Sequence, residues 1–285
     1  MPPDNSGAPL HLAIALFQRC QLNCRYCYHV PAVFRDIVTP AAAGDILLFI
    51  DAMVQQSGRK LSVFFTGYEP LLQFERLRKV ADRLVEGYRD RLLTLALATN
   101  GAALSSETAS YLVARRFKVT LSCDGLRYVH DRNRPSRSAD RRTYGRVLRA
   151  LRLLLHNGVT PHVRLTYMPD TIPYVTAGIK SLYRAGARRF GLAAALDHGD
   201  WSNLAINRLR SELELLINWY DETRKVDTSL YIAGLAPSRR RNGNGWLCPA
   251  ADGLLAISSD GLLYLCWRFI GERRWLIGVP GETLS

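Results

Sequence analysis

The sequence has no apolar run that approaches the roughly 18 residues needed to cross a membrane. It also lacks the basic start of a secretory signal peptide, and its N-terminal run LAIALF is shorter than the roughly 7 to 15 residues of a signal-peptide core. We therefore expect a soluble cytoplasmic protein without a membrane partner. In that reducing compartment, clustered cysteines favour a metal site over a disulfide.

The one dense cysteine cluster lacks a fourth member. Cys20, Cys24 and Cys27 have the spacing CxxxCxxC, whereas a metal site closed by thiolates normally has four ligands. Three thiolates can hold a cubane 4Fe-4S cluster and leave one iron open to a small molecule. The alternatives are a zinc site with a fourth ligand such as His29, and a redox pair formed by Cys24 and Cys27.

Acidic residues are too few to balance the basic ones, and the formal net charge is +13. Such a charge suits nucleic acid, an acidic peptide or an anionic surface. The basic residues are spread through helical patterns and are dense only at residues 132–142 and 238–245, which indicates solvated helix faces and loops. A nucleic-acid partner is therefore not expected, whereas an acidic substrate segment remains open.

Strands and helices alternate through most of the chain. The predicted strands are residues 11–17, 60–66, 92–99, 117–122, 161–168 and 188–196. The helices that follow them are residues 39–56, 71–88, 105–116, 143–158, 175–186 and 204–225, the first with Thr39 as N-cap and Pro40 at its first position. Six units predict a parallel sheet and are too few for an eight-stranded barrel. We expect an α/β fold, an open partial (β/α)6 TIM-like barrel.

The last part of the chain has a different pattern. From about residue 226 the helical periodicity stops, and Ser259-Asp260-Gly261 forms a turn signal between two apolar runs. This predicts a small β-hairpin extension at residues 226–285, added to a core barrel at residues 1–225.

Unusual residues follow each of the predicted strands. The cysteine loop follows the first strand, and the sequences TGYEP (66–70), TNG (99–101) and SCDG (122–125) follow the next three. In parallel α/β folds the carboxyl ends of the strands carry the functional loops. The sequence therefore predicts that all these motifs meet at one rim of the barrel.

Together these motifs resemble the radical S-adenosylmethionine (SAM) superfamily. The resemblance rests on CxxxCxxC with Tyr26 before its last cysteine, and on FFTGYEPLL, LATNG and SCDGLRYVHDRNRP in the same order. It extends from about residue 11 to 278. The branch that it resembles most is the peptide- and protein-modifying enzymes with a SPASM or twitch extension, which include anaerobic sulfatase-maturating enzymes.

The resemblance implies an activity and its cofactors. Cys20, Cys24 and Cys27 would ligate a 4Fe-4S cluster, and SAM would bind the open iron through its amino and carboxylate groups. An external electron donor such as flavodoxin or ferredoxin would reduce the cluster, and reductive cleavage of SAM would give a 5′-deoxyadenosyl radical that takes a hydrogen atom from the substrate. The implied substrate is a peptide or protein, as in the maturation of a ribosomally made peptide.

The resemblance also implies roles for residues at the first two strand ends. The backbone at Tyr26 would touch the adenine, and Thr66, Gly67 and Glu69 would hold the methionyl ammonium, since a carboxylate complements a cation. The family usually has Gly-Gly-Glu-Pro, whereas this chain has Tyr68 at the second position. If a positive φ is needed there, Tyr68 is costly.

Further candidates follow the third and fourth strands. Ser122 and Asp124 alternate on one side, which would direct both at the ribose and leave Cys123 facing the outer helices. They could also be a capped Asp-Gly turn. Cys123 is interpreted as a buried core thiol, with a hydrogen-atom donor as the alternative. Asn100 is expected to support the rim or contact the cofactor, and His130 to form hydrogen bonds in a loop rather than act as a base.

Cys248 and Cys266 flank Gly261 in the spacing C-x12-G-x4-C, which is similar to the opening of a SPASM or twitch module. No cysteine follows Cys266, and two thiolates cannot fill four positions of an auxiliary cluster. Three interpretations remain open: the chain is cut short or completed by a partner, an auxiliary cluster uses ligands other than cysteine, or the two cysteines are leftover thiols that lie near each other.

Two other classes of function remain open. The first is a radical SAM enzyme that acts on nucleic acid, suggested by the net charge. The second is a non-enzymatic zinc or iron-sulfur protein that keeps the fold as a scaffold. Steep salt-dependent binding of RNA would support the first. Metal analysis and an absorption spectrum would separate the second, since a zinc protein is colourless and an iron-sulfur protein is brown.

Overall fold

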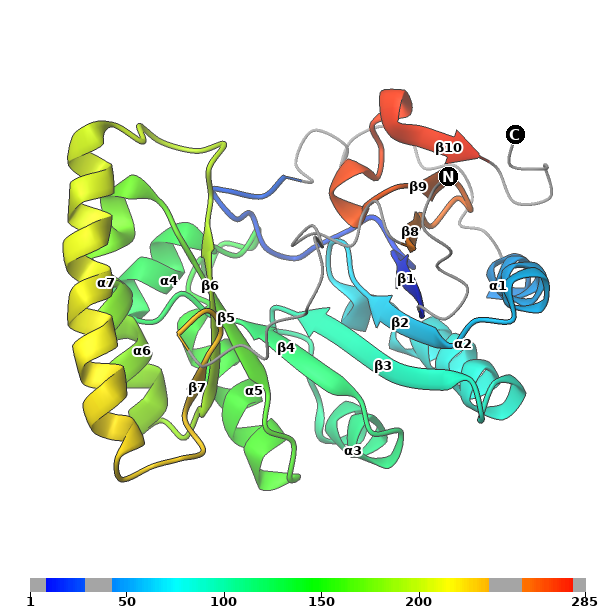
Figure 1. The fold of residues 1–285 in the computed structure, drawn as a ribbon, viewed down its shortest axis with the longest axis horizontal. Helices are drawn as coiled ribbons and strands as arrows, with labels where there is room; N and C mark the ends of the chain where they lie inside the picture. The colour runs from blue at the N-terminus through cyan, green and yellow to red at the C-terminus, as the bar shows by residue number, and fades with distance from the viewer. Residues whose placement is uncertain (1–8, 29–42, 236–252, 279–285) are drawn as a thin grey trace, which may run out of the picture.

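The computed structural model describes residues 9–28, 43–235 and 253–278. Its centre is a curved sheet whose outer face is covered by helices (Figure 1). Six parallel strands lie side by side in chain order. They are β1 (Leu10–Ile14), β2 (Leu61–Phe65), β3 (Leu92–Thr99), β4 (Lys118–Ser122), β5 (His162–Tyr167) and β6 (Arg189–Ala194).

The helices lie at almost every position that the periodicity predicts. They are α1 (Ala43–Ser57), α2 (Phe74–Gly87), α3 (Ser106–Ala114), α5 (Tyr144–His156), α6 (Val175–Arg184) and α7 (Asn203–Arg224). Short 3-10 helices lie at Pro70–Gln73, Pro169–Tyr174, Trp267–Phe269 and Arg273–Trp275. One helix was not predicted, α4 (Arg127–Asn133), because its seven residues lie in a segment that reads as a loop.

The two faces of the sheet lie in different environments, because buried and less buried side chains alternate along its strands. In β2, Leu61, Val63 and Phe65 are buried in the core beneath the helices, while Ser62 and Phe64 are half-buried on the opposite face. Successive side chains of a strand point to opposite faces. We call the face away from the helices the lumen face of the barrel.

The sheet continues beyond both ends of the six strands. At one edge β7 (Tyr231–Ile232) pairs with β6. At the other, β8 (Leu254–Ile257) pairs in parallel with β1, and β9 (Leu263–Tyr264) and β10 (Leu276–Gly278) follow in antiparallel register. The order β10-β9-β8-β1-β2-β3-β4-β5-β6-β7 is linear. The prediction of an open partial barrel is therefore confirmed.

The predicted hairpin at residues 259–261 is also present, because β8 and β9 pair antiparallel around it. Gly261 has a φ of 81° and its N–H donates to the Ser258 carbonyl at 2.9 Å. Since β8 is bonded directly to β1, the hairpin extends the barrel sheet itself. The division of the chain at residue 225 remains a prediction.

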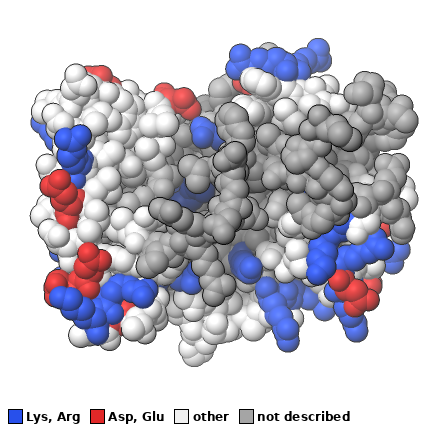
Figure 2. All heavy atoms as spheres, in the orientation of Figure 1, with Lys and Arg blue, Asp and Glu red and all other residues white. Residues whose placement is uncertain are grey.

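Several predictions fall on residues outside the described ranges: Thr39, Pro40, His29, Cys248 and the basic run at 238–245. Among the helices that the structure describes, none is both long and apolar enough to cross a bilayer. On the face seen in Figure 2, Lys and Arg lie in several separate groups with Asp and Glu among them.

Candidate functional site

The cysteine loop leaves the carboxyl end of β1 and holds its three thiols half-buried. Burial raises the pKa of Cys20 to about 11 and that of Cys24 to about 12, and the charges of the neighbouring thiols add to both shifts. The three sulfurs are therefore close enough to repel one another as thiolates. A bound metal reverses this effect because its positive charge deprotonates a coordinating thiol.

The zinc alternative remains a prediction. Within the described residues, no three His, Cys, Asp or Glu side chains are arranged to hold a single metal ion. The suggested fourth zinc ligand, His29, lies outside those residues.

Residues 133–137 run alongside the cysteine loop. The Asn23 N–H donates to the Pro135 carbonyl at 2.8 Å, and the Arg25 N–H donates to the Asn133 carbonyl at 2.9 Å. Residues 133–136 are buried, so Arg134 is an exception to the interpretation of the basic residues as mostly solvated. These backbone bonds fix the loop that carries the thiols.

The TGYEP turn follows β2 and has two consecutive residues with positive φ. Gly67 has a φ of 83°, and a Cβ added there would lie 2.9 Å from the Cβ of Ala15. Tyr68 has a φ of 52°, a region that costs a non-glycine residue roughly 1 kcal/mol. The departure from the family pattern at Tyr68 is therefore accommodated with backbone strain. Thr66, before the turn, is buried.

Glu69 is fully buried beneath this turn. One carboxylate oxygen accepts hydrogen bonds from the Thr99 hydroxyl at 2.7 Å and from the Leu71 N–H at 3.1 Å. The other accepts from the Asn100 N–H at 2.7 Å. Burial nevertheless raises the pKa of Glu69 to about 7, and the three hydrogen bonds only partly oppose the shift. No cation among the described residues is paired with this carboxylate.

Asn100 connects Glu69 to the cysteine loop. Its Nδ2 donates to the Cys20 sulfur at 3.5 Å, and its Oδ1 accepts from the Gln21 side chain at 3.2 Å. The Leu22 N–H donates to the same sulfur at 3.4 Å. The prediction that Asn100 supports the rim is consistent with these bonds, and its contact with a cofactor remains a prediction.

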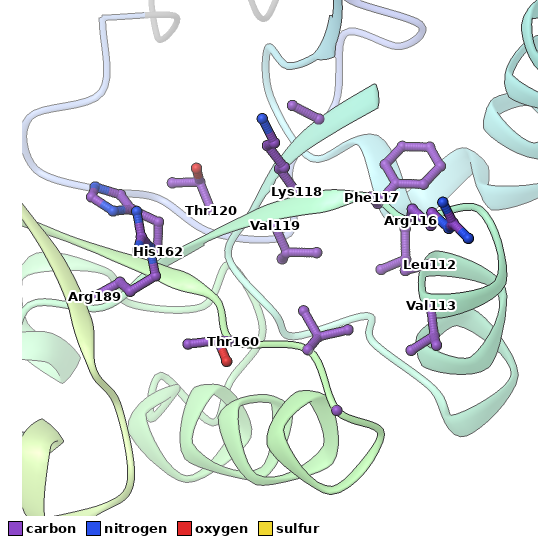
Figure 3. A pocket seen from close by; sticks show the side chains of 13 residues that line it. Leu112, Val113, Arg116, Phe117, Lys118, Val119, Thr120, Thr160, His162 and Arg189 are labelled. Atoms are coloured by element: carbon purple, nitrogen blue, oxygen red, sulfur yellow. The ribbon is translucent and has the colours of Figure 1, made fainter. Parts of the chain in front are cut away.

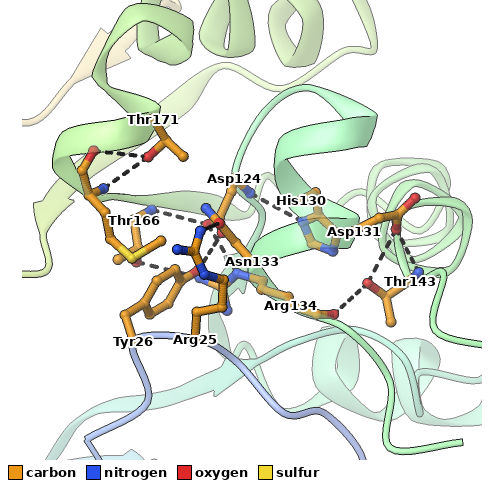
Figure 4. A network of polar contacts seen from close by, with 11 residues as sticks. Arg25, Tyr26, Asp124, His130, Asp131, Asn133, Arg134, Thr143, Thr166 and Thr171 are labelled. Atoms are coloured by element: carbon orange, nitrogen blue, oxygen red, sulfur yellow. Dashed lines mark hydrogen bonds and ion pairs between the residues drawn. The ribbon is translucent and has the colours of Figure 1, made fainter. Parts of the chain in front are cut away.

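Asp124 is the second buried carboxylate of the rim (Figure 4). One oxygen accepts from the Arg134 Nε at 3.0 Å and from the Thr166 N–H at 3.2 Å. The other accepts from the Tyr26 hydroxyl, whose ring lies 5.2 Å from the Arg134 guanidinium carbon. Sequence reasoning missed Arg134 as the partner, and its only signal was the basic run.

The contacts of Asp124 show what it does within the protein. Its carboxylate accepts hydrogen bonds from three protein groups, which shows a structural role for Asp124. The expected contact of Ser122 and Asp124 with a ribose remains a prediction. His130 is buried on α4, and its Nδ1 accepts from the Asp124 N–H at 3.2 Å. Burial lowers the pKa of His130 to about 4, which keeps the ring neutral and able to accept. His130 thus forms a hydrogen bond as expected, but from a helix rather than a loop.

Two further cysteines are buried. Cys123 is 1% exposed and belongs to the core beneath the helices, where burial raises its pKa to about 12. Its position is that of a packed core thiol. Cys266 is buried after β9, and its predicted companion Cys248 lies outside the described residues.

Comparison with known proteins identifies the fold and the family. The family model of the radical SAM superfamily matches residues 14–180, more than half of the chain. The chain belongs to this superfamily. Membership implies SAM and a 4Fe-4S cluster as cofactors.

Two relatives show how far the sequence likeness extends. The chain is 30% identical over 181 residues to an uncharacterized protein of Methanocaldococcus jannaschii, covering 60% of each. It is 30% identical over 122 residues to a cysteine-type anaerobic sulfatase-maturating enzyme of Clostridium perfringens, covering 40% of this chain and 32% of that enzyme. The chain therefore spans less than two thirds of the length of either relative.

The fold matches solved radical SAM structures over almost its whole length. Native anSMEcpe with bound AdoMet has a TM-score of 0.80 at 21% identity, covering 97% of this chain and 79% of that one. The same protein with bound AdoMet and the Cp18Cys peptide has a TM-score of 0.76, with the same identity and coverage. At this identity the likeness shows the fold alone, an open radical SAM barrel.

Proposed function

We propose that the protein is a radical SAM enzyme that abstracts a hydrogen atom from a peptide or protein substrate. The observation that carries the proposal is the bonded path from the Cys20 sulfur through Asn100 to Glu69. It joins a half-buried thiol of the cysteine loop to a buried carboxylate that has no cation beside it within the described part of the chain. SAM bound to an iron-sulfur cluster would provide an iron for the thiol and an ammonium group for the carboxylate.

The residues at the rim fit the implied cofactors. Cys20, Cys24 and Cys27 would hold three irons of the cluster. Glu69, with the Thr66–Gly67 backbone, would hold the methionyl ammonium, because a buried carboxylate is stabilised by a cation beside it. When bound and reduced, the cluster would supply the electron that cleaves SAM and so starts radical chemistry.

The contribution of the protein itself is to position the cofactor and to exclude water from it. Residues 133–137 hold the cysteine loop in place, and the Asp124–Arg134 pair anchors that segment under the loop through Tyr26. On β3, Ala96 and Ala98 present small side chains to the lumen face, which leaves room for a nucleoside. The buried hydrogen bonds and the ion pair form a fixed polar environment, and such an environment orients a reactive cofactor and keeps water from it.

A peptide substrate is supported by two of the similar proteins. One relative is a cysteine-type anaerobic sulfatase-maturating enzyme, and one structural neighbour was solved with bound AdoMet and the Cp18Cys peptide. By the same analogy, a flavodoxin or ferredoxin would serve as electron donor. An auxiliary cluster at Cys248 and Cys266 remains a minor part of the proposal, since only Cys266 lies within the described residues.

The test is reconstitution under anaerobic conditions. Wild-type protein with iron, sulfide, dithionite and SAM should turn brown and release 5′-deoxyadenosine, measured by liquid chromatography and mass spectrometry. Cys24→Ser should lose both the cluster absorbance and the product. A colourless wild-type protein that contains zinc, or a brown protein that releases no nucleoside, would contradict the proposal.

A further inference from the structure

The lumen face of β4, β5 and β6 carries an unusual set of side chains. The helix-facing positions are buried, which places Lys118, His162, Arg164 and Arg189 on the opposite, accessible face. Strand register places them close together: His162 pairs with Arg189 and with Thr120, which is two residues after Lys118, and Arg164 pairs with Ser122. The pKa of His162 is lowered, so its imidazole is neutral near pH 7, and we call the other three residues, Lys118, Arg164 and Arg189, the lumen cations.

No acidic residue balances them within the three strands, whose sequences are KVTLS, HVRLTY and RFGLAA. The surroundings of His162 show the same excess of positive charge. Its pKa is lowered by burial and then by the charges of Arg189 and Arg164, and no acidic group opposes the shift. The imidazole lies across Gly191, where an added Cβ would be 2.4 Å from its Nε2.

Lys118, Arg189 and the His162 ring line a cavity of about 610 Å³ at the amino ends of the strands, and its wall also includes Leu112 and Val113 of α3. In Figure 3, Lys118, Thr120, His162 and Arg189 point to the same side of the sheet, and Val119 points to the other. The Lys118 Nζ donates to the Thr94 hydroxyl at 3.3 Å, and the Arg189 guanidinium lies 4.6 Å from the Tyr231 ring. These contacts hold the cations in place without neutralising them.

Arg164 extends the set toward the rim. It pairs with Ser122 of β4, two residues before Asp124. Positive charge on the lumen face therefore continues from the amino ends of the strands toward the rim. A ligand along this path would have anionic groups below the site and its reacting atom at the rim.

We propose that the lumen cations bind carboxylate side chains of an acidic peptide, so that the substrate threads the lumen with an acidic residue below the modified one. This inference rests on the proposed function, whose substrate class it narrows. Arg189 lies level with His162, so Arg189 and Arg164 are on neighbouring strands and are offset by two residues, roughly 7 Å along the strands. Carboxylates at positions i and i+2 of an extended peptide have the same spacing.

The strand geometry also sets a distance in the substrate. The layer of His162 and Arg189 lies level with Thr120, four residues below Asp124 at the rim. At about 3.3 Å per residue this is roughly 13 Å, or about four residues of extended chain. The acidic residues should therefore fall about two to four positions from the modified residue.

Binding of a defined probe tests the inference. A fluorescein-labelled peptide of four Gly-Glu repeats is titrated with full-length protein at low salt, and fluorescence anisotropy is measured. We expect it to bind at least tenfold more tightly than the Gly-Gln peptide. The double variant Arg164→Gln, Arg189→Gln should weaken binding at least tenfold, and Arg164→Lys, Arg189→Lys should restore most of it.

The matched control is Arg149→Gln with Arg208→Gln, which removes the same charge from exposed outer helices and should change binding less than twofold. Equal loss in both double variants, or equal binding of the two peptides, would overturn the proposal. Adenosine triphosphate that binds through the lumen cations while the Gly-Glu peptide does not would overturn the peptide assignment. The assay needs neither SAM nor a reduced cluster, so its failure is distinct from a failure to release 5′-deoxyadenosine.

Discussion

Glu69 and Asp124 are both buried carboxylates at the carboxyl ends of parallel strands, but the groups that surround and compensate their charges differ. Asp124 has Arg134 as a buried ion-pair partner at 3.0 Å, and it also accepts from Tyr26 and Thr166. Glu69 has three hydrogen bonds and no cation among the described residues, and burial raises its pKa to about 7.

The difference in charge compensation distinguishes a structural carboxylate, Asp124, from a carboxylate of the candidate site, Glu69. A buried charge is stable when a counter-charge and hydrogen bonds compensate its desolvation, and Asp124 has both within the protein. For Glu69, hydrogen bonds alone leave part of the desolvation uncompensated. A group kept in that state is typical of functional positions. The ion pair of Asp124 locks the rim, and Glu69 is the carboxylate that a cationic ligand would complete.

The largest effect should come from removing the counter-charge of Asp124. Arg134→Met leaves a carboxylate buried without its cation, and breaking such a pair typically costs about 3–5 kcal/mol. We expect urea unfolding to show a loss of this size. Arg132→Met, an exposed arginine two residues away, is the control and should cost less than about 1 kcal/mol. A loss below that limit in Arg134→Met would show that the pair does not lock the rim.

The next effect is a pH dependence that belongs to Glu69. Its pKa rises from 4.5 to about 7 on folding, so between these values the folded protein binds more protons than the unfolded chain. Stability due to this group is therefore complete below about pH 4.5 and is lost as the pH rises through 7. A shift of this size corresponds to roughly 3 kcal/mol.

Urea unfolding of the cofactor-free protein between pH 4.5 and 8 measures this dependence. Glu69→Gln should remove it and should be as stable as wild type or more stable at pH 8. If the variant and the wild type show the same pH slope, a hidden counter-charge already compensates Glu69.

A smaller effect is expected on ligand binding. Glu69→Gln removes the charge that would face the methionyl ammonium, and a hydrogen bond to a charged group contributes about 1.5–3 kcal/mol. SAM affinity, measured by equilibrium dialysis on the reconstituted protein, should fall roughly 10- to 150-fold. Unchanged affinity would place the ammonium elsewhere.

The contrast between the two carboxylates also marks how far the sequence could lead. The strand-end positions of Glu69 and Asp124 follow from the six strand-helix units, because parallel strands bring their carboxyl ends to one rim. Their partners could not be read in the same way. Arg134 reaches Asp124 only because α4 turns the chain back, and α4 is too short to show a clear helical period.

Other features depended on contacts between distant segments. The pairing of residues 133–137 with the cysteine loop joins parts of the chain more than 100 residues apart, and no local pattern encodes it. The hairpin turn at Gly261 was predictable from its own residues, whereas the parallel pairing of β8 with β1 was not. Local propensity shows elements, and long-range register decides which of them meet.

The smallest effect concerns the bond by which Glu69, unlike Asp124, is coupled to the cysteine loop. Asn100→Ala keeps its backbone N–H to Glu69 but removes the Nδ2 donor to the Cys20 sulfur. The substitution also removes the Oδ1 that accepts from the Gln21 side chain and from the Ala102 N–H. A loss of stability would therefore reflect three hydrogen bonds, and the midpoint potential is the measurement specific to the sulfur donor. Hydrogen bonds to cluster sulfurs influence the reduction potential, and removal of a donor leaves more charge on the thiolate. The midpoint potential, followed by electron paramagnetic resonance, should therefore fall in Asn100→Ala and stay unchanged in Ser122→Ala. An equal potential in wild type and Asn100→Ala would mean that Asn100 only packs the rim, and that the two carboxylates differ in charge balance alone.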